Sequence, residues 1–321
     1  MAFYDVFNGD ADGLCALHQL RMANPRDAEL VTGVKRDINL LKRLETVSDA
    51  TITVLDISLD KNRSALLGLL NRGCSVLYFD HHFAGEIPQS DKLEAHIDPS
   101  PEVCTSLLVD RYLDGRYKTW AITAAYGDNL IESAEAAADH IGLDRDTRRT
   151  LRTLGELLNY NGYGHSLDDL HFAPAVLYQA VHAYDDPVAF FEKAPEARIL
   201  LRGFEDDMAN AERSAPIHES ASGRVYRYPC AKWARRIMGV YANRVANEDR
   251  DRASALIVDN ADGSLRISVR APKNRPSGAD TLCRAFPTGG GRAGAAGINA
   301  LPADQLDAFL SKFDEVFAAH A

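Results

Sequence analysis

The chain has 321 residues, of which 46% are hydrophobic and 26% are charged, and its formal net charge is -10. The length suggests two domains, and the composition excludes an intrinsically disordered or fibrous protein. The negative charge disfavours the binding of long nucleic acids, whose phosphates it repels, unless a local basic groove compensates.

The first part of the sequence alternates short apolar runs with amphipathic stretches. Buried strands are predicted at residues 3–7, 51–57 and 75–80, and helices at 13–22, 39–47 and 61–71. Strands that alternate with helices imply a parallel sheet covered on both faces. We therefore expect the α/β fold class, with a parallel sheet flanked by helices.

From residue 102 to about residue 183 the pattern is mostly helical, interrupted by NYNGYGHS at 159–166. That segment is rich in turn-forming residues, so we expect it not to be helical. A charged helix is predicted at 195–213 and another helix at 233–245. Residues 222–229 and 252–270 alternate apolar and polar side chains, and the second stretch has a turn at 261–263, which is typical of a hairpin.

The end of the chain carries a glycine-rich segment, TGGGRAGAAGIN (288–299), which we expect to form a loop, and then an amphipathic helix opened by Pro302. The predicted organisation is a metal-binding catalytic domain at 1–190, a helical linker at 191–220 and a substrate-binding domain at 221–321. The second domain is expected to be a smaller α/β unit with a mixed sheet.

The cysteines are odd in number, widely spaced and without a CxxC pair, which argues against a disulfide framework and a zinc ribbon. We expect them to be buried apolar fillers. The sequence starts without a signal-peptide pattern and has no apolar run near ~20 residues. A cytoplasmic protein without a membrane partner is expected. The cysteines are Cys15, Cys74, Cys104, Cys230 and Cys283.

Acidic side chains follow each of the three predicted strands. Because the carboxyl ends of neighbouring parallel strands meet in one crevice, we expect these side chains to gather there. Carboxylates that close repel one another and have raised pKa values unless cations neutralise them. Oxygen and imidazole ligands together suit manganese, and Asp56 is predicted to bridge two ions. The side chains at the strand ends are Asp10, Asp12, Asp56, Asp80, His81 and His82.

Five motifs carry a resemblance to a known family. They are NGDADG (8–13), VLDIS (54–58), FDHH (79–82), YGDN (126–129) and, far downstream, GGGRAGAAG (289–297). In order and spacing they resemble the DHH phosphoesterase superfamily with its DHH-associated C-terminal domain, over most of the chain. That superfamily includes RecJ-like exonucleases, nanoRNases, cyclic- and linear-dinucleotide hydrolases, and phosphatases of bisphosphorylated nucleotides.

The resemblance implies a centre of two Mn²⁺ ions, with Mg²⁺ as the alternative. It implies metal ligation by Asp10, Asp56, His81 and Asp128, support of the cluster by Asp80, and a place for His82 close to the substrate phosphate. Asp56, Asp80 and His82 would carry the catalysis. The C-terminal domain would close over the crevice and hold the nucleotide with Arg270, Arg292 and the backbone amides of Gly289, Gly290 and Gly291.

Three departures from the family pattern affect the site. The first motif usually opens with a histidine and an aspartate, where this chain has Tyr4 or Val6 and then Asn8, so Asn8 is a weaker ligand of one metal site. The glycine segment usually carries histidine where this chain has Arg292, which adds a fixed charge able to grip phosphate. Asp12 occurs in only some branches and is either an extra carboxylate or a cap for the following helix.

The function expected from these residues is metal-dependent hydrolysis of linear dinucleotides such as pGpG, or of very short oligonucleotides, to nucleoside monophosphates. The acidic surface and the lack of a Lys/Arg-rich run or a further nucleic-acid-binding domain favour short substrates over long duplexes. The alternatives are a RecJ-like single-strand exonuclease, a phosphatase of bisphosphorylated nucleotides, and a nucleotide-binding regulator with a degraded metal site. The oligomeric state, homodimer included, stays open.

Overall fold

The computed structural model describes residues 2–318. The chain divides into two units, Met1–Arg202 and Gly203–Ala321. The division falls within helix α9 (Pro195–Glu212), inside the segment 191–220 that the sequence predicts to be a helical linker.

The first unit is built on a sheet of parallel strands in the order β2-β1-β3-β4-β5. The three predicted strands, β1, β3 and β4, lie side by side at its centre. The edge strands, β2 and β5, complete the sheet, and the apolar pattern of the sequence did not reveal them. The strands are β1 (Phe3–Asn8), β2 (Glu29–Gly33), β3 (Thr51–Leu55), β4 (Ser75–Asp80) and β5 (Leu93–Ile97).

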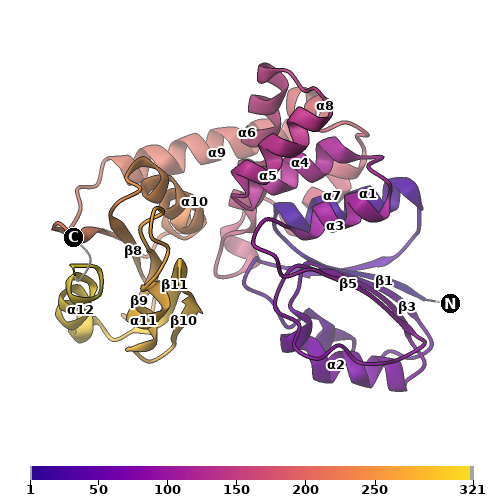
Figure 1. Cartoon of the computed structure of the whole chain (residues 1–321), viewed down its shortest axis with the longest axis horizontal. Helices are drawn as coiled ribbons and strands as arrows, with labels where there is room; N and C mark the ends of the chain where they lie inside the picture. Colours follow the sequence, from indigo (N-terminus) through magenta and orange to yellow (C-terminus); the bar gives the residue numbers. More distant parts are fainter. Residues whose placement is uncertain (1, 319–321) are drawn as a thin grey trace. The chain divides into compact units, whose positions relative to one another are not determined.

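Helices cover both faces of this sheet, as Figure 1 shows. Helix α2 (Leu59–Asn71) and the 3₁₀ helix Leu40–Leu44, which replaces the longer helix predicted at 39–47, pack on one face. Helix α1 (Ala11–Ala23) leads the helices on the other face. Those that follow are α3 (Thr105–Tyr112), α4 (Lys118–Gly127), α5 (Ile131–His140), α6 (Arg145–Gly162), α7 (Pro174–His182) and α8 (Pro187–Lys193).

Side chains of strand β1 pack against helices on both faces of the sheet. Its side chains alternate between the faces of the sheet. Val6 joins the buried cluster that contains Leu66 and Leu69 of α2. Phe7 lies on the opposite face, with its ring centroid 5.7 Å from that of Tyr178 in α7. The strand is therefore buried on both faces, as expected for a central parallel strand.

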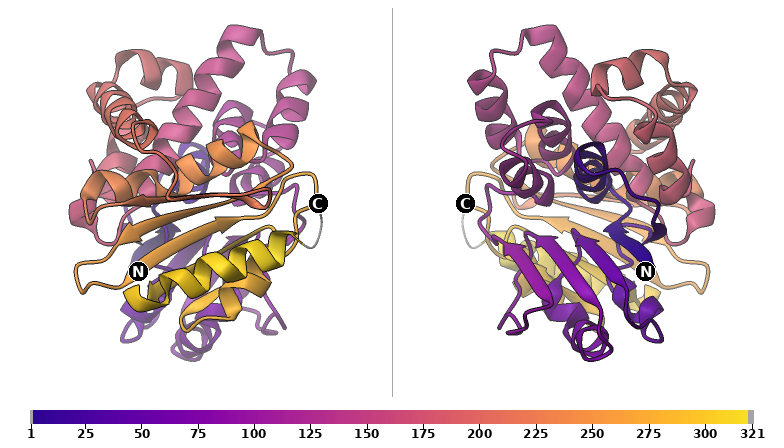
Figure 2. Two further views of the ribbon diagram at one scale, coloured as in Figure 1. Left: turned by 90° about the vertical axis from the view of Figure 1, so that its left-hand side faces the viewer. Right: turned by 90° about the vertical axis from the view of Figure 1, so that its right-hand side faces the viewer.

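The second unit carries a mixed sheet in the order β10-β11-β9-β8-β7-β6, in which only β7 and β8 run parallel. Figure 2 shows helices on both of its faces. The predicted fold class, a parallel sheet with helices and a second mixed α/β unit, is confirmed. The elements are β6 (His218–Glu219), β7 (Gly223–Tyr228), α10 (Lys232–Glu248), β8 (Ala253–Asp259), β9 (Leu265–Arg270), α11 (Ala279–Arg284), β10 (Gly289–Arg292), β11 (Ala295–Leu301) and α12 (Leu306–Ala318).

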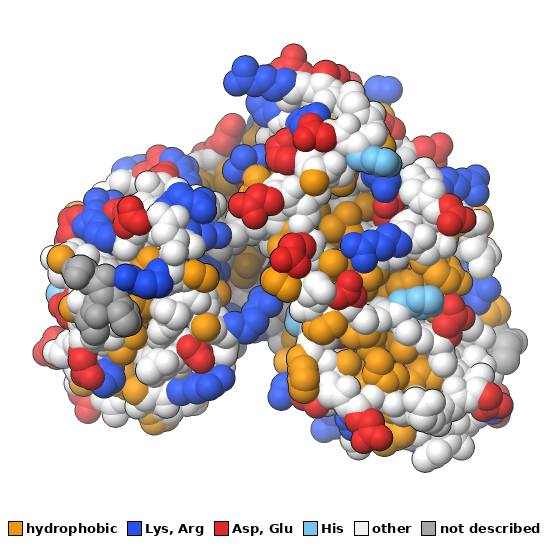
Figure 3. Space-filling model, viewed as in Figure 1, with side chains coloured by type: hydrophobic (Ala, Val, Ile, Leu, Met, Phe, Trp, Pro, Cys, Tyr) orange, Lys and Arg blue, Asp and Glu red, His pale blue; other side chains and the backbone are white. Residues whose placement is uncertain are grey.

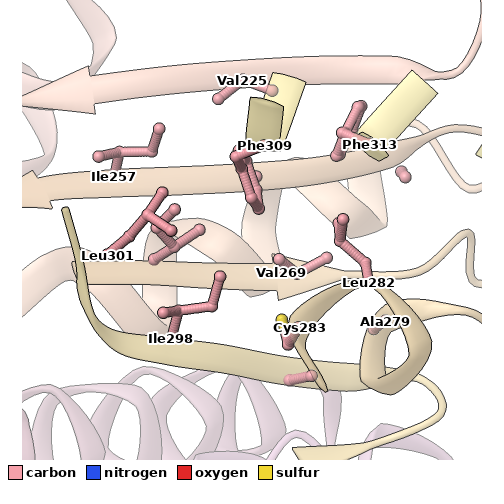
Figure 4. Close-up of a cluster of buried hydrophobic side chains, with 14 of the residues drawn as sticks. Val225, Ile257, Val269, Ala279, Leu282, Cys283, Ile298, Leu301, Phe309 and Phe313 are labelled. Atoms are coloured by element: carbon pink, nitrogen blue, oxygen red, sulfur yellow. The ribbon is translucent and has the colours of Figure 1, made fainter. Parts of the chain in front are cut away.

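The core of the second unit lies between this sheet and the amphipathic C-terminal helix. Phe309 and Phe313 of α12 point toward Val225, Ile257 and other side chains of the sheet (Figure 4). These phenylalanines are fully buried. The amphipathic helix predicted at the end of the chain is therefore confirmed, with Phe309 and Phe313 on its buried face.

Three further expectations about local structure are wrong. Residues 159–162 of the segment predicted to be non-helical form the last turn of α6. Their side chains make tertiary contacts that outweigh weak helix propensity, such as the hydrogen bonds of Asn161 to the main chain of Phe172, at 2.9 and 3.1 Å. The glycine-rich segment forms the β10–β11 hairpin instead of a loop. Cys230 is exposed, whereas the other four cysteines are buried as expected.

Within residues 2–318, no helix combines the length and the apolar character that crossing a bilayer requires.

Candidate metal centre

Side chains that follow β1, β3 and β4 meet at the carboxyl edge of the parallel sheet. The strand order reverses direction between β1 and β3, and open α/β sheets bind ligands at such a switch point. Asp10 follows β1, Asp56 follows β3, and Asp80 ends β4. Asp128 reaches the same place from the end of α4, as the contacts below show.

His81 presents one ring nitrogen to this group of carboxylates. Its Nδ1 lies 2.9 Å from the carbonyl oxygen of Val103, which can only accept, so Nδ1 carries the hydrogen and Nε2 keeps its lone pair. Nε2 is 3.4 Å from Asp56 Oδ1, 3.8 Å from Asp128 Oδ2 and 4.0 Å from Asp12 Oδ2. A backbone carbonyl that orients the ring in this way is usual for metal-binding histidines.

Asp56 is buried, with 2% of its surface exposed, and its backbone has φ +58°. Aspartate adopts this left-handed conformation more readily than most residues, and such conformations concentrate at functional sites. Thr105 Oγ1 donates a hydrogen bond of 3.2 Å to Asp56 Oδ1. Burial, followed by repulsion from Asp10 and Asp12, raises the pKa of Asp56 well above its usual value. The charged form of Asp56 therefore needs a nearby cation.

Asp80 and His82 form a hydrogen-bonded pair. His82 Nδ1 lies 2.7 Å from Asp80 Oδ1, and Asp80 Oδ2 accepts a hydrogen bond of 3.3 Å from the main-chain N–H of Leu59 at the start of α2. Burial lowers the pKa of His82, but the hydrogen bond to Asp80 and the charge of Asp56 outweigh it, so the net pKa is raised. Asp80 thus orients His82, whose side chain remains 39% exposed.

Lys35, in the segment after β2, lies among the predicted metal ligands. Its ammonium group forms a short ion pair with Asp10 Oδ2 and lies 3.4 Å from Asp128 Oδ1 and 2.9 Å from Asn159 Oδ1. Burial raises the pKa of Asp10, but Lys35 outweighs it and the net pKa is lowered. Lys35 therefore compensates Asp10, whereas Asp56 lacks comparable compensation.

Asp12 caps a helix, but not the one that the sequence suggested. Its Oδ2 and Oδ1 accept hydrogen bonds of 2.7 Å from the main-chain N–H groups of Thr105 and Ser106, at the start of α3. The cap of α1 is Asp10, whose Oδ1 accepts from the N–H groups of Asp12 and Gly13 at 3.0 and 3.1 Å. Both helices therefore begin at the centre.

Two overlapping groups of side chains can hold a metal ion among the described residues. In each group the ligand atoms all lie within 4.8 Å of one another. Buried carboxylates beside an oriented imidazole are a donor set that suits Mn²⁺ or a similar divalent ion, so these residues fit such an ion. The first group is Asp56, His81 and His82, and the second is Asp12, His81 and Asp128.

Asn8, predicted as a weak ligand, is 5% exposed and ends β1. Its Nδ2 donates to the main-chain oxygen of Lys35 at 3.2 Å, and its buried Oδ1 has no hydrogen-bond partner among residues 2–318. A buried acceptor without a partner is rare and is consistent with a ligand that completes it.

The predicted substrate-binding residues lie in the second unit. Arg270 ends β9, and its Nε donates a hydrogen bond of 2.8 Å to Asn243 Oδ1 in α10. Arg292 ends β10 and is exposed. Residues 289–291 form an edge strand whose partner is β11, so the expected glycine loop is corrected to a hairpin.

Nothing in the sequence pattern singles out Lys35, Asn159 or Thr105, because a single lysine, asparagine or threonine in a loop or at a helix is ordinary. Tyr160 is fully buried and its hydroxyl lies 2.8 Å from His171 Nε2, so it is a core residue. Tyr163 lies beside Lys35, with its ring centroid 5.6 Å from Nζ.

Comparisons with known proteins show which domain and which folds the chain resembles. Residues 224–319 match the DHHA1 domain. The whole chain is similar to an exonuclease RecJ structure bound to manganese, with 17% identity and a TM-score of 0.64, covering 100% of this chain and 91% of that chain. RecJ of Thermus thermophilus in complex with Mn²⁺ has 17% identity and a TM-score of 0.66, covering 100% of this chain and 52% of that chain.

The chain is also similar to PggH of Vibrio cholerae, described as a pGpG-specific phosphodiesterase, with 12% identity, a TM-score of 0.54 and coverage of 98% of this chain and 100% of that chain. No curated protein sequence matches the chain. Residues 224–319 thus carry a DHHA1 domain, as the resemblance to the DHH phosphoesterase superfamily implied, and the whole chain shares the fold of the RecJ and PggH structures.

Proposed function

We propose that this protein is a divalent-metal-dependent phosphodiesterase that hydrolyses linear dinucleotides, such as pGpG, or very short oligonucleotides to nucleoside monophosphates. One observation carries the proposal: buried carboxylates and the oriented ring of His81 gather at the switch point of a fold shared with phosphoesterases. We propose Mn²⁺ as the metal, because mixed carboxylate and imidazole ligands suit it.

A divalent ion bound at this centre would lower the pKa of a water molecule and draw charge from the phosphoryl oxygens. The chain supplies the arrangement around it. Asp56 and His81 would hold the ion, and Thr105 fixes Asp56 through its hydrogen bond of 3.2 Å. Asp80 holds His82 with one ring nitrogen directed away from the pair, so that His82 donates a hydrogen bond to the phosphoryl group or a proton to the departing ribose oxygen.

Phe83 supplies an aromatic surface directly after His82. It is 73% exposed, the most exposed of the large hydrophobic side chains among the described residues. Hydrogen bonds fix the main chain here: Ser58 Oγ donates to Phe83 O at 3.4 Å, and Arg63 donates to the carbonyl oxygen of Ala84. An exposed, positioned ring beside a phosphate site is suited to stacking on a nucleobase.

Short substrates are favoured over long ones by the charge of the molecule. The formal net charge is -10, and on the face in Figure 3 acidic and basic side chains are interspersed on each unit. A long phosphate backbone gains little on such a surface, whereas a dinucleotide needs only the metal and a few donors. The fold similarity to the pGpG-specific phosphodiesterase supports the same choice.

A single-strand exonuclease activity is the second candidate, because the TM-scores to the RecJ structures, 0.64 and 0.66, exceed the 0.54 to the dinucleotide enzyme. A phosphatase of bisphosphorylated nucleotides and a regulator without catalysis are the remaining alternatives.

A substrate panel tests the proposal. With Mn²⁺ present, turnover of pGpG, of a long single-stranded oligonucleotide and of a 3′-phosphorylated nucleotide would be compared for the wild type and Asp56→Ala. We expect pGpG to dominate and the variant to lose about 100-fold or more of the activity. Dominant turnover of the long oligonucleotide would replace the proposal with the exonuclease. A protein that binds no metal and hydrolyses none of the three would be a regulator.

A further inference from the structure

The ammonium group of Lys35 is surrounded by oxygen atoms from three separate segments. They come from Asp10 after β1, Asp128 at the end of α4, and Asn159 in α6. A lysine ammonium has three donors and a single positive charge. Two of the three acceptors belong to carboxylates predicted to bind metal, so Lys35 occupies a cation position in the centre.

The placement of Lys35 is set by its main chain as well as its charge. Its N–H donates a hydrogen bond of 2.8 Å to Gly162 O, and its carbonyl oxygen accepts one of 3.2 Å from Asn8 Nδ2. The ring of Tyr163 lies beside the side chain, which is 26% exposed. These hydrogen bonds of the Lys35 N–H and carbonyl groups hold its main chain in place next to Asp10.

Both carboxylate oxygens of Asp10 already have hydrogen-bond partners within the chain. Oδ1 accepts two N–H groups at the start of α1, and Oδ2 is paired with Lys35. Asp10 also belongs to neither of the metal-capable groups found within the described part of the chain. The carboxylate that the family resemblance assigns to one ion is therefore used by the protein itself.

The two metal-capable groups do not amount to two sites. Both contain His81, whose Nδ1 is already bonded to Val103 O, so only the Nε2 lone pair is free to bind an ion. One lone pair binds one ion. The neutral amide of Asn8 adds no negative charge to support a second.

We infer that the Lys35 ammonium takes the place of one of the two expected divalent ions, so that the centre holds a single ion on His81. Asp56 and Asp128 lie nearest to His81 Nε2 and would complete its ligation. The inference rests on the proposed metal-dependent function. Lys35 would then be a fixed monovalent positive charge beside the substrate phosphate. The fold is shared with RecJ structures solved with manganese.

Metal stoichiometry tests this inference without an activity measurement. The apo protein would be titrated with Mn²⁺ by calorimetry, and the loaded protein examined by electron paramagnetic resonance. The wild type is expected to bind one Mn²⁺ per chain and to show the spectrum of an isolated ion. Lys35→Ala frees Asp10 Oδ2 and is expected to bind a second Mn²⁺, with the spectrum of an exchange-coupled pair. Lys35→Arg, which keeps the positive charge, is expected to bind one.

The outcomes separate the inference from the proposed function. Two coupled ions in the wild type would overturn the inference and leave the proposed function intact. One ion in Lys35→Ala would also overturn it, because Lys35 would then not be what excludes the second ion. No bound ion in the wild type would remove the proposed function itself. The wild-type result decides the matter even if a variant does not fold.

Discussion

Arg21 of α1 and Asp5 of β1 form an ion pair with two contacts, between the parallel sheet and the helix α1 that packs on it. Arg21 Nε donates to Asp5 Oδ2 at 2.7 Å, the second contact is shorter, and Thr53 Oγ1 accepts from the same guanidinium at 2.9 Å. The two residues are only 5% and 2% exposed. The pair fixes α1, whose first turn carries Asp10 as its cap, against β1 and β3.

Breaking this pair from one side should be strongly destabilising. Because Asp5→Leu or Arg21→Met leaves a buried charge without a partner, each is expected to lower the free energy of unfolding by about 3–5 kcal/mol. The double variant should lose far less unfolding free energy than the two single variants together. Urea denaturation of the wild type, the two single variants and the double variant measures the coupling between the residues. Glu156→Ala, which removes an exposed pair with Arg152, is a control expected to cost under about 0.5 kcal/mol. Additive losses would show that the pair is not coupled.

His18 should make stability fall in mild acid. It is fully buried, its Nε2 donates to Tyr184 O, and its Nδ1 accepts from His182 Nδ1 at 3.1 Å. Burial and His182 lower the pKa of His18 to about 3. Since the folded pKa lies below the unfolded value of about 6.5, this stability is present above pH ~6.5 and is lost as the pH falls toward 3, on the order of 5 kcal/mol in all.

The difference in unfolding free energy between the wild type and His18→Asn measures this effect. The difference should shrink as the pH is lowered from 7 to 4, because only the wild type has to keep His18 neutral. A constant difference for His18→Asn would contradict the assignment.

The parts of the fold that the sequence predicts are those with strong local signals. Strands β1, β3 and β4 are mostly apolar, and each leads into acids. The edge strands β2 and β5, ELVTG and LEAHI, are missed because edge strands tolerate polar residues and are only half-buried. Strand β10 is missed because glycine is disfavoured in strands, and at an edge only one neighbour is needed to hold it.

The candidate site divides in the same way. Acids at strand ends can be recognised, because several lie at equivalent places in a repeated pattern. Lys35 cannot, because its role depends on a chain path that brings residues 10, 35, 128 and 159 together. Asp12 was assigned either an extra ligand or a local cap, and its contact with α3 spans more than ninety residues of sequence. Contacts of that separation leave no local pattern.

Asp56→Asn should separate metal binding from folding. Asparagine keeps the acceptor for Thr105 and tolerates φ +58°, and it removes a charge that Asp10 and Asp12 repel. The apo variant is therefore expected to be as stable as the wild type or more stable. Mn²⁺ at about 100 times its dissociation constant should stabilise the wild type by about 2.7 kcal/mol, and the variant far less. Thermal unfolding with and without Mn²⁺ measures both. Equal stabilisation of the two proteins would exclude Asp56 as a ligand.

Phe83→Ala should weaken substrate binding without affecting the fold. Loss of one stacking contact, worth about 1–3 kcal/mol, is expected to raise KM for a dinucleotide about 5- to 150-fold and to change kcat little. Because the ring is 73% exposed, the melting temperature should hardly move. Leu67→Ala, at a 42% exposed position of α2, is the matched control and should leave KM unchanged. An unchanged KM in Phe83→Ala would rule out base stacking at this ring.

Gly155 sets the distance between α6 and α4, and through it the position of Asp128. A Cβ atom at residue 155 would lie 2.1 Å from Thr123 O and 2.8 Å from the nitrogen of Gly127, both main-chain atoms of α4. Gly155→Ala must therefore push the helices apart, at a cost of about 1–3 kcal/mol. Since Asp128 follows α4 directly, Mn²⁺ affinity should fall as well.

Gly68→Ala provides the opposite case in the same unit. Gly68 lies inside α2, and the nearest atom to an added Cβ is the flexible guanidinium of Arg72, at 3.1 Å. Alanine there is expected to raise the unfolding free energy by up to about 1 kcal/mol, because it favours the helix. Denaturation and Mn²⁺ titration of both variants give the comparison. If Gly155→Ala proved as stable as Gly68→Ala, with unaltered Mn²⁺ affinity, the close approach of α4 and α6 would not be what positions Asp128.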